Sequence, residues 1–425
     1  MKQQLTKLSN GVRVVTAHMP GSYSATVSIF AEVGSRYEDF GVNGGVSHFL
    51  EHLLFKGTKR WPSTKAISEQ IDAVGGWNNA YTSAELTDYY VKVPYRQVPL
   101  ALDILVDMVR NPLLKPSELD RERNVVLEEM NVYRDDPASY VHRLTPALLW
   151  PGHPLSQEVL GNEEVIKTIT PAGVRTYLQN HYQPSRLVVA VAGRVNHEAI
   201  VKQAERLLGD MQDTEPQVAA PIAQELNGDI AAALTKDTAQ VHLVIATTAY
   251  PYRHEYDPAA KLVATILGRG LSSRLFLNVR ERQGLAYSVT AGLENYVDSG
   301  EFEVYAGVNR AKQAEAITAI IGELQRIGHE PVAKAELDKA KHQIRGGLEM
   351  AMESNGAVAD RIGTQLALLG SIRSVRQVIR EIDAVTPAQL RKVAAEMLAP
   401  ERLRLGIISP EPDTAVNTFH ELITK

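Results

Sequence analysis

The sequence predicts an α+β fold of two similar domains, each a mainly antiparallel sheet packed with helices. Three observations lead to this prediction. The chain has 425 residues, which is too long for one ordinary hydrophobic core. Its apolar content of 44% and charged content of 22% are typical of a globular protein. The order of strands and helices expected in the first half recurs in the second half, which indicates an internal duplication.

The first elements are two strands and a helix. Residues 11–16 and 25–30 are rich in β-branched side chains that partly alternate with others, which predicts strands. The turn sequence GVNGGV at 41–46 follows, and it precedes a helix that either Asn43 or Ser47 is expected to cap.

The rest of the first half predicts helices where apolar residues recur every three or four positions and strands where they alternate or run together. These elements are a helix at 64–74, strands at 78–82 and 88–93, helices at 97–110 and 116–134, a buried strand at 187–191 and a helix at 197–208.

A stretch rich in Pro, Gln and Asp separates the two halves and has little periodicity, which predicts a linker. We therefore expect an N-terminal domain at 1–212, the linker at 213–228 and a C-terminal domain at 229–425. The second half predicts a strand at 242–247, a helix at 258–267, a Gly/Ser turn and a further helix, strands at 286–293 and 301–308, helices to about 398 and a strand at 403–408.

Composition excludes several classes of protein. The net charge is only −5 and no run of basic residues marks a phosphate-binding face, so we expect no nucleic-acid partner. Cysteine is absent, so any zinc site must use histidine and carboxylate ligands. No stretch has the length and apolarity of a signal peptide or a membrane span, so we expect a cytoplasmic protein without membrane contact.

The sequence SHFLEHLLFKGT contains the most informative pattern of the chain. His48 and His52 are four residues apart, so in a helix they lie one above the other on one face, at a spacing where two imidazoles reach one metal ion. Glu51 projects close to the same face. H-x-x-E-H is the inverted motif of zinc hydrolases, with two metal ligands and a carboxylate that acts as general base.

A catalytic zinc site needs a third protein ligand and one position for water. The helix expected at 116–134 offers Glu122, Glu128 and Glu129. Glu122 and Glu129 are seven residues apart and share a face, whereas Glu128 points about 100° away from Glu129. The spacing alone leaves the choice between these acids open.

The chain resembles the pitrilysin (insulinase) family of zinc peptidases, which includes mitochondrial processing peptidase and its bacterial relatives. The motif H-x-x-E-H is matched at His48, Glu51 and His52. Further stretches typical of the family run through nearly the whole chain: ERNVVLEEM, GGWNNAYTSAELTDYY, GHPLSQEVLG, HYQPSRLVVAVAG and SSRLFLNVRERQGLAYS.

The resemblance implies the ligand set and the activity. In this branch of the family the third ligand is the later glutamate of an E-x6-E pattern, here Glu129, and the earlier one, Glu122, supports the ligands from behind. One Zn²⁺ per chain is expected, and it would lower the pKa of a water molecule. Glu51 would take the proton of that water and pass it to the leaving amine of a cleaved peptide.

The resemblance also implies residues that contact the substrate. Asn79, Ala80 and Tyr81 look like the edge strand on which family members pair an extended peptide. Arg280 and Tyr287 match the arginine–tyrosine element of the family, which donates hydrogen bonds to the substrate or to the oxyanion.

Large family members join two units of this size in one chain as a clamshell. This chain has the length of one unit and carries both the zinc motif and the Arg280–Tyr287 element. We therefore expect a homodimer that encloses a chamber, with Arg280 and Tyr287 acting at the zinc site of the partner subunit. The alternative function is a non-catalytic scaffold or binding subunit of the same fold, although such subunits usually lose part of the motif.

Overall fold

The computed structural model describes residues 2–213, 218–222 and 228–424, so most of the expected linker at 213–228 lies outside the described residues. The chain forms two compact units. The first consists of Met1–Met130, Gln157–Ala220 and Glu349–Arg373. The second consists of Asn131–Ser156, Pro221–Leu348 and Ser374–Lys425.

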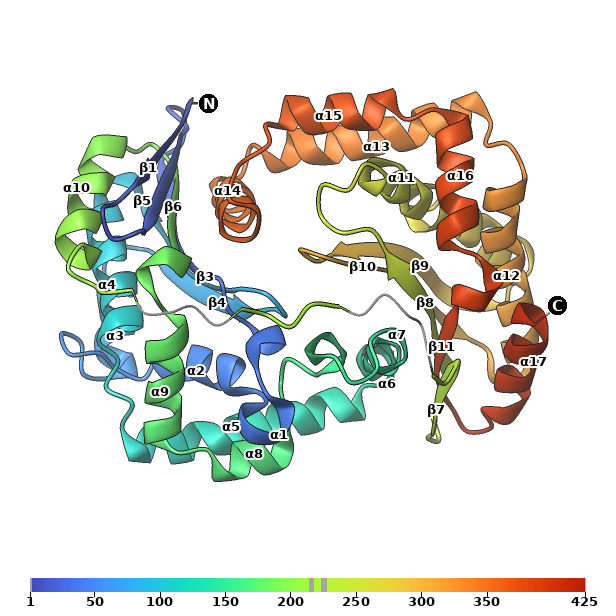
Figure 1. Cartoon of the computed structure of the whole chain (residues 1–425), viewed down its shortest axis with the longest axis horizontal. Helices are drawn as coiled ribbons and strands as arrows, with labels where there is room; N and C mark the ends of the chain where they lie inside the picture. Colours follow the sequence, from blue (N-terminus) through green and yellow to red (C-terminus); the bar gives the residue numbers. More distant parts are fainter. Residues whose placement is uncertain (1, 214–217, 223–227, 425) are drawn as a thin grey trace. The chain divides into compact units, whose positions relative to one another are not determined.

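Each unit contains one mixed sheet whose strand pairs are mainly antiparallel, as predicted (Figure 1). The first sheet has the order β1(Lys2–Lys7), β2(Arg13–His18), β6(Leu187–Gly193), β3(Ser24–Ala31), β5(Thr87–Pro94), β4(Trp77–Thr82). The second has the order β7(Ala231–Thr235), β11(Arg404–Ser409), β8(Val241–Ala249), β10(Gly300–Val308), β9(Ala286–Asn295).

The two sheets share one topology. When β1 is set aside, β2-β6-β3-β5-β4 corresponds strand for strand to β7-β11-β8-β10-β9. In both series the first pair is parallel and the three that follow are antiparallel. This agreement in order and direction supports the internal duplication that the sequence predicts.

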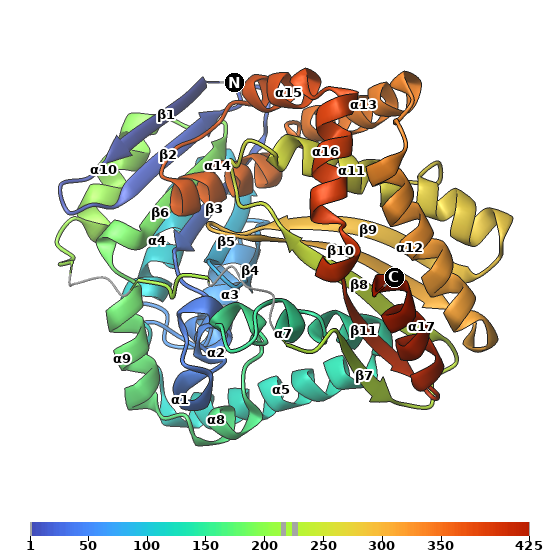
Figure 2. The same ribbon diagram turned by 45° about the vertical axis from the view of Figure 1, so that its right-hand side comes forward.

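Helices cover both faces of the first sheet. One face packs on α2(Val46–Leu54), α4(Val98–Arg110) and α10(His197–Leu208) in the main hydrophobic cluster of the unit. The other face packs on α14(Asn355–Leu369), which lies against β3 and β6 (Figures 1 and 2). A Cβ atom on Gly363 of α14 would lie 1.9 Å from the Phe30 ring, so only glycine permits this close approach.

The compact units differ from the contiguous domains 1–212 and 229–425, because each unit includes a segment from the other half of the chain. All seven residues of β6 are buried, so alternate side chains need an apolar partner on each face of the sheet. The segment 349–373 supplies that partner for the first sheet. In the second unit, segment 131–156 contributes η3(Val141–Arg143) and α7(Pro146–Leu149). Helix η3 contacts β8 and β11, and α7 contacts β8.

The remaining α-helices and the π-helix η6 belong to the rest of the two units, beside several single-turn 3₁₀ helices. In the first half of the chain they are α1(Phe40–Asn43), α3(Thr64–Asp72), α5(Pro116–Asp135), α6(Pro137–Tyr140), α8(Glu163–Thr168) and α9(Pro171–His181). In the second half they are α11(Asp257–Gly268), η6(Phe276–Arg282), α12(Gln313–His329), α13(Lys334–Ala351), α15(Val375–Ala384), α16(Pro387–Met397) and α17(Asp413–Ile423).

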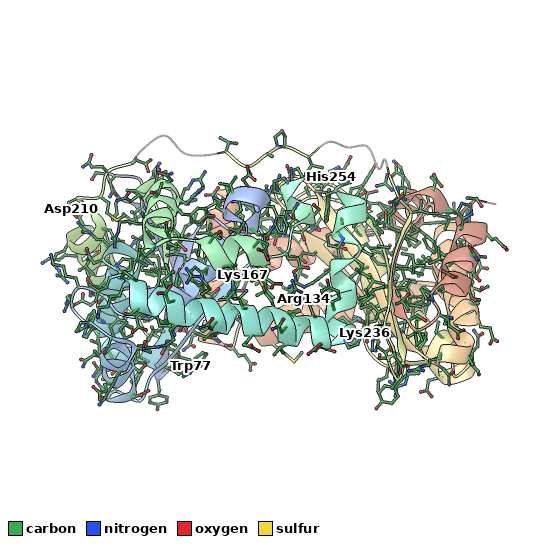
Figure 3. The ribbon with its side chains drawn as sticks, turned by 90° about the horizontal axis from the view of Figure 1, so that it is seen from below. Trp77, Arg134, Lys167, Asp210, Lys236 and His254 are labelled. Carbon is green, nitrogen blue, oxygen red and sulfur yellow. The ribbon has the colours of Figure 1, made fainter. Side chains whose placement is uncertain are left out.

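Helix α5 ends in the second unit, where the Lys236 ammonium donates to the Arg134 carbonyl at 2.8 Å (Figure 3). This contact satisfies one of the carbonyls that a helix leaves unpaired at its C-terminal end. Within the described ranges, no helix combines the length and the apolarity that a bilayer crossing requires.

The expected caps of α2 are wrong. The residue before the helix is Gly45, whose φ of +93° favours glycine, and Ser47 lies inside the helix with its hydroxyl 2.7 Å from that of Tyr177. The buried carboxylate of Glu38 instead accepts the amides of Gly45 and Ser47, at 2.6 and 2.7 Å. It therefore satisfies amides that the first turn leaves unpaired.

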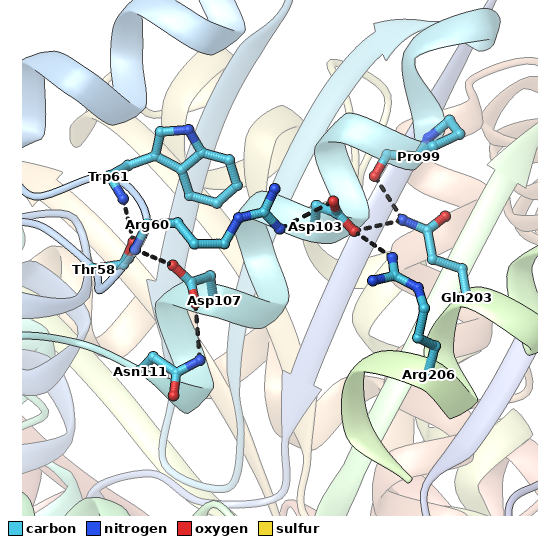
Figure 4. Close-up of polar contacts among 9 residues, drawn as sticks. All are labelled: Thr58, Arg60, Trp61, Pro99, Asp103, Asp107, Asn111, Gln203 and Arg206. Atoms are coloured by element: carbon cyan, nitrogen blue, oxygen red, sulfur yellow. Dashed lines mark hydrogen bonds and ion pairs between the residues drawn. The ribbon is translucent and has the colours of Figure 1, made fainter.

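The loop after α2 is held by two carboxylates of α4 (Figure 4). Asp107 accepts the backbone amide of Arg60 at 3.0 Å. Asp103 accepts the Arg60 guanidinium at 3.1 Å and, from α10, the amide of Gln203 at 2.8 Å and the guanidinium of Arg206 at 3.2 Å. These contacts hold the loop that follows the helix with the histidine pair.

Candidate metal centre

Three predicted ligands come together in the first unit. His48 and His52 lie on successive turns of α2, with ring centroids 4.7 Å apart, and Glu129 reaches them from α5. One ligand atom from each residue lies within 4.8 Å of the other two. Among the described residues, this is the one group of histidine and carboxylate side chains close enough to hold a metal ion.

The distances fit a tetrahedral ion. The Nε2 atoms of His48 and His52 both lie 3.6 Å from the same Oε2 atom of Glu129. Zinc bound at about 2.0–2.2 Å by nitrogen and oxygen holds neighbouring ligand atoms roughly 3.3–3.6 Å apart. Two of the three separations are therefore those of a tetrahedral site, and the third, between the two imidazoles, is within 4.8 Å.

Glu122 orients one of the ligands. Its buried carboxylate lies 3.2 Å from His52 Nδ1 and 2.8 Å from the Lys56 ammonium. Burial acts to raise the pKa of Glu122, but the hydrogen bonds from His52 and Lys56 outweigh it and hold this pKa below its usual value. When Nδ1–H of His52 donates to the carboxylate, the lone pair of Nε2 is left for a metal ion.

The three glutamates that the spacing left open lie at different distances from the histidine pair. Glu129 belongs to the candidate metal group, and Glu122 contacts the Nδ1 atom of His52. Both glutamates project from one face of α5. Glu128 is exposed and lies outside the group. The helix period places it on another side of α5.

Glu51 lies beside the group and is not part of it. Its Oε2 atom accepts a hydrogen bond of 2.5 Å from the Thr82 hydroxyl, at the end of β4. Burial raises the pKa of Glu51, while the Thr82 hydrogen bond and the nearby charge of His52 act in the opposite direction. A partly buried carboxylate held next to a group of metal-binding candidates is suited to accept a proton from water.

The strand that carries Asn79, Ala80 and Tyr81 is β4, the edge strand of the first sheet, as predicted. Ala80 donates its amide to the side chain of its neighbour Asn79 at 2.9 Å. Tyr81 points to the opposite face of the strand from Thr82, and its hydroxyl donates to Asp360 of α14 at 2.7 Å. Because β4 pairs only with β5 in the described sheet, its other edge is open for strand pairing. Helix α14 holds the Tyr81 side chain in place.

Arg280 and Tyr287 belong to the second unit, whereas the three metal-binding candidates belong to the first. The Arg280 guanidinium carbon lies 5.4 Å from the ring centroid of Tyr287 and 4.9 Å from that of Phe276. Tyr287 is 73% exposed, so its hydroxyl is available to a binding partner. The structure brings this predicted pair of side chains together.

Three contacts of the site, made by Lys56, Thr82 and Asp360, were not predicted. Lys56 and Thr82 stand inside the motif-bearing stretches of sequence, four residues after His52 and one after Tyr81, and the spacing of Lys56 could have indicated its contact. Asp360 comes from a helix almost three hundred residues away in the chain, and no local pattern indicates its contact with Tyr81.

The comparisons with known proteins agree with these features. Residues 13–163 match the family model "Insulinase (Peptidase family M16)", and residues 168–344 match "Peptidase M16 inactive domain". An uncharacterized zinc protease of Streptomyces coelicolor is 35% identical over 98% of this chain and 92% of its own length. One of Bacillus subtilis is 34% identical over 94% of this chain and 97% of its own.

Solved structures show the same fold. A protease from Helicobacter pylori matches with a TM-score of 0.89 at 23% identity, over 96% of this chain and 99% of that one. A Pseudomonas fluorescens structure described as a peptidase M16 inactive domain matches with a TM-score of 0.88 at 18% identity, over 97% of this chain and 98% of that one. The near-complete matches to the zinc proteases and the two family models show that this chain belongs to the insulinase family, peptidase family M16.

Proposed function

We propose that the protein is a zinc-dependent endopeptidase that hydrolyses peptides or unfolded segments, with one zinc ion per chain. The observation that carries the proposal is the group of His48, His52 and Glu129, in which one carboxylate oxygen lies 3.6 Å from both imidazoles, a spacing that suits a tetrahedral ion. The curated relatives from Streptomyces and Bacillus are named zinc proteases, which supports zinc as the metal.

Bound zinc would supply a water molecule of lowered pKa and polarise the peptide carbonyl. Glu51 would accept the proton of this water, since its carboxylate stands next to the two ligand histidines on α2. Thr82 fixes the orientation of that carboxylate through its 2.5 Å hydrogen bond. Glu51 would then deliver the proton to the amine that leaves, which completes hydrolysis.

The substrate would bind as an added strand at the edge of the first sheet. The Ala80 amide donates to the Asn79 side chain. It becomes available for a substrate when that side chain rotates away. Main-chain pairing at an open edge binds peptides of many sequences. The end of the same strand carries Thr82, which contacts Glu51, so a peptide paired with β4 would pass next to the general base.

The second candidate is a non-catalytic binding subunit. It is favoured by one observation, that residues 168–344 match a model described as an inactive domain. A zinc determination and a quenched-peptide assay separate the two functions. We expect about one zinc per chain and cleavage that a chelator abolishes and added zinc restores. A protein that binds zinc but cleaves none of a broad peptide library would support the binding subunit.

We also propose that two copies of the chain form a homodimer around a closed chamber, in which Arg280 and Tyr287 hydrogen-bond a substrate at the partner's zinc site. The exposure of Tyr287 supports its availability to a substrate. Mixing Arg280→Ala chains with Glu51→Gln chains tests this arrangement. Each variant alone is expected to be nearly inactive, and the mixed dimer should regain up to about half of the wild-type rate per site. Mixed dimers that stay inactive would contradict action in trans.

A further inference from the structure

Helix α14 crosses the face of the first sheet that lies opposite α2 (Figure 2). It is held there near both ends. In its first turn, the buried Asn355 donates to the Ser24 hydroxyl at 2.8 Å and accepts from the Thr26 hydroxyl at 3.1 Å. Near its C-terminal end, the Arg13 guanidinium donates to the Leu366 carbonyl at 2.8 Å. The helix is therefore a firm support for anything that is attached to it.

Asp360 attaches this helix to the edge strand β4. Its carboxylate accepts the Tyr81 hydroxyl at 2.7 Å, although the two residues are 279 positions apart. Burial and the charge of Asp360 raise the pKa of Tyr81, so the hydroxyl keeps its proton and remains a donor. Asp360 is exposed and lies outside the apolar cluster that packs α14 on the sheet, so its replacement should leave that packing intact.

The backbone of β4 determines which side chain lies closest to an added strand. The Ala80 amide donates to the Asn79 side chain, which shows that it is turned to the open edge and away from β5. Peptide groups of successive residues point to opposite sides of a strand, so those of Tyr81 face β5. In an antiparallel pair, residues of this second kind form the non-hydrogen-bonded pairs, whose side chains approach most closely. A peptide added in this way would place one of its side chains directly beside Tyr81.

The two neighbouring residues Tyr81 and Thr82 face different parts of the site. Side chains alternate along a strand, so Tyr81 lies on the face that α14 covers and Thr82 on the face of α2, where it contacts Glu51. Thr82 therefore borders the general base, whereas Tyr81 borders a substrate side chain. A disturbance of Tyr81 should affect the binding of a peptide and leave the chemical step unchanged.

We propose that Asp360 is a positioning residue for substrate binding: it holds the Tyr81 hydroxyl, and α14 thereby fixes the side chain against which an extended peptide packs on β4. The inference rests on the proposed binding of a peptide at this edge. Without the contact the Tyr81 side chain gains rotational freedom, and its ordering on binding costs affinity.

A double-mutant cycle on the zinc-loaded full chain tests this role. Asp360→Ala and Tyr81→Phe each remove one partner of the hydrogen bond, and each should raise the KM of a quenched casein peptide about 5-fold, the usual cost of ordering one side chain. The kcat should stay within about 2-fold, because binding is lost and the chemical step is not. The double variant should have the KM of either single variant, since all three lack the same contact.

Two further variants separate the contact from a general effect on the helix. Asp360→Asn should bind nearly as tightly as the wild type, because its amide oxygen still accepts from the Tyr81 hydroxyl. Glu353→Ala is the matched control, since this exposed acid stands two residues before α14, and it should leave the KM unchanged. Should Asp360→Ala unfold, Tyr81→Phe carries the same test, and wild-type affinity in it would refute the role of Asp360.

A binding measurement keeps this result separate from the proposed hydrolysis. The Kd of the same casein peptide, labelled with fluorescein and measured by anisotropy in the Glu51→Gln background, should rise by the same factor of about 5. A wild-type protein that binds the peptide without cleaving it would contradict the peptidase function, and the cycle would then be read in Kd alone. Unchanged affinity in Asp360→Ala, additive effects in the double variant, or no binding of the peptide at all would overturn the positioning role.

Discussion

Glu51→Gln should reduce the turnover of peptide substrates by about 10²–10⁴-fold, the usual contribution of a positioned general base. Glutamine has nearly the same shape and still accepts the hydrogen bond of the Thr82 hydroxyl, but it takes no proton at neutral pH. Because Glu51 is not one of the three metal-binding candidates, zinc content should stay at one ion per chain. The measurement is kcat with a quenched peptide beside elemental analysis of the same sample.

The matched control for this variant is Glu128→Gln. Glu128 is an exposed glutamate on α5, next in sequence to the predicted ligand Glu129, and it does not belong to the candidate metal group. It should retain wild-type turnover and zinc. If Glu51→Gln also cleaves at a rate close to that of the wild type, another group accepts the proton and the role proposed for Glu51 is wrong.

A comparison of the two halves shows that the fold alone does not make a metal site. Helix α11 follows β8 in the second half as α2 follows β3 in the first, and the two sheets share one topology. Yet α11, with the sequence DPAAKLVATILG, has neither histidine nor glutamate. Its one acid, Asp257, is buried and pairs with Lys261 at 2.7 Å. The candidate metal site therefore depends on the histidines and the glutamate that α2 carries and α11 lacks.

Local patterns predicted most of the fold. The helix at 197–208 agrees in both ends with α10, since a capping Asn196 and an amphipathic face define it locally. Strands β1 and β7 and helix α17 were missed, and so were all the helices between α5 and β6, of which α9 is the longest. The sequences of the two strands, KQQLTK and AAALT, have little β-branched or alternating character, and what makes them strands is pairing with β2 and β11.

Tertiary contacts account for what the sequence could not predict. The cap of α2 comes from Glu38, whose carboxylate reaches two amides from the preceding loop. The apolar face of α14 is visible as a helical period, but nothing in that period indicates that it covers the first sheet rather than the second. The same holds at the site, where Glu129 was identified through the family and its distance to the histidines is visible only in the fold.

His52→Ala should weaken metal binding far more than a variant of a neighbouring residue, because it removes one of the three predicted protein ligands. If the ligands contribute about equally to a binding free energy on the order of 10 kcal/mol, the loss is roughly 3 kcal/mol, or more than 100-fold in affinity. Glu122→Gln leaves the three ligands intact and weakens only the orientation of His52, so it should cost about 10–100-fold. Zinc dissociation constants measured by competition with a chromogenic chelator give this order directly.

A larger loss of zinc affinity in His52→Ala than in Glu122→Gln would distinguish His52, a ligand, from Glu122, which orients it. His420→Ala is the control for the loss of an imidazole, since this histidine is exposed at the end of α17, and it should bind zinc as tightly as the wild type. Melting curves with and without zinc show whether His52→Ala remains folded, and a folded protein that no longer gains stability from zinc has lost the site itself. Wild-type zinc affinity in His52→Ala would place the metal elsewhere and remove the physical basis of the proposed hydrolysis.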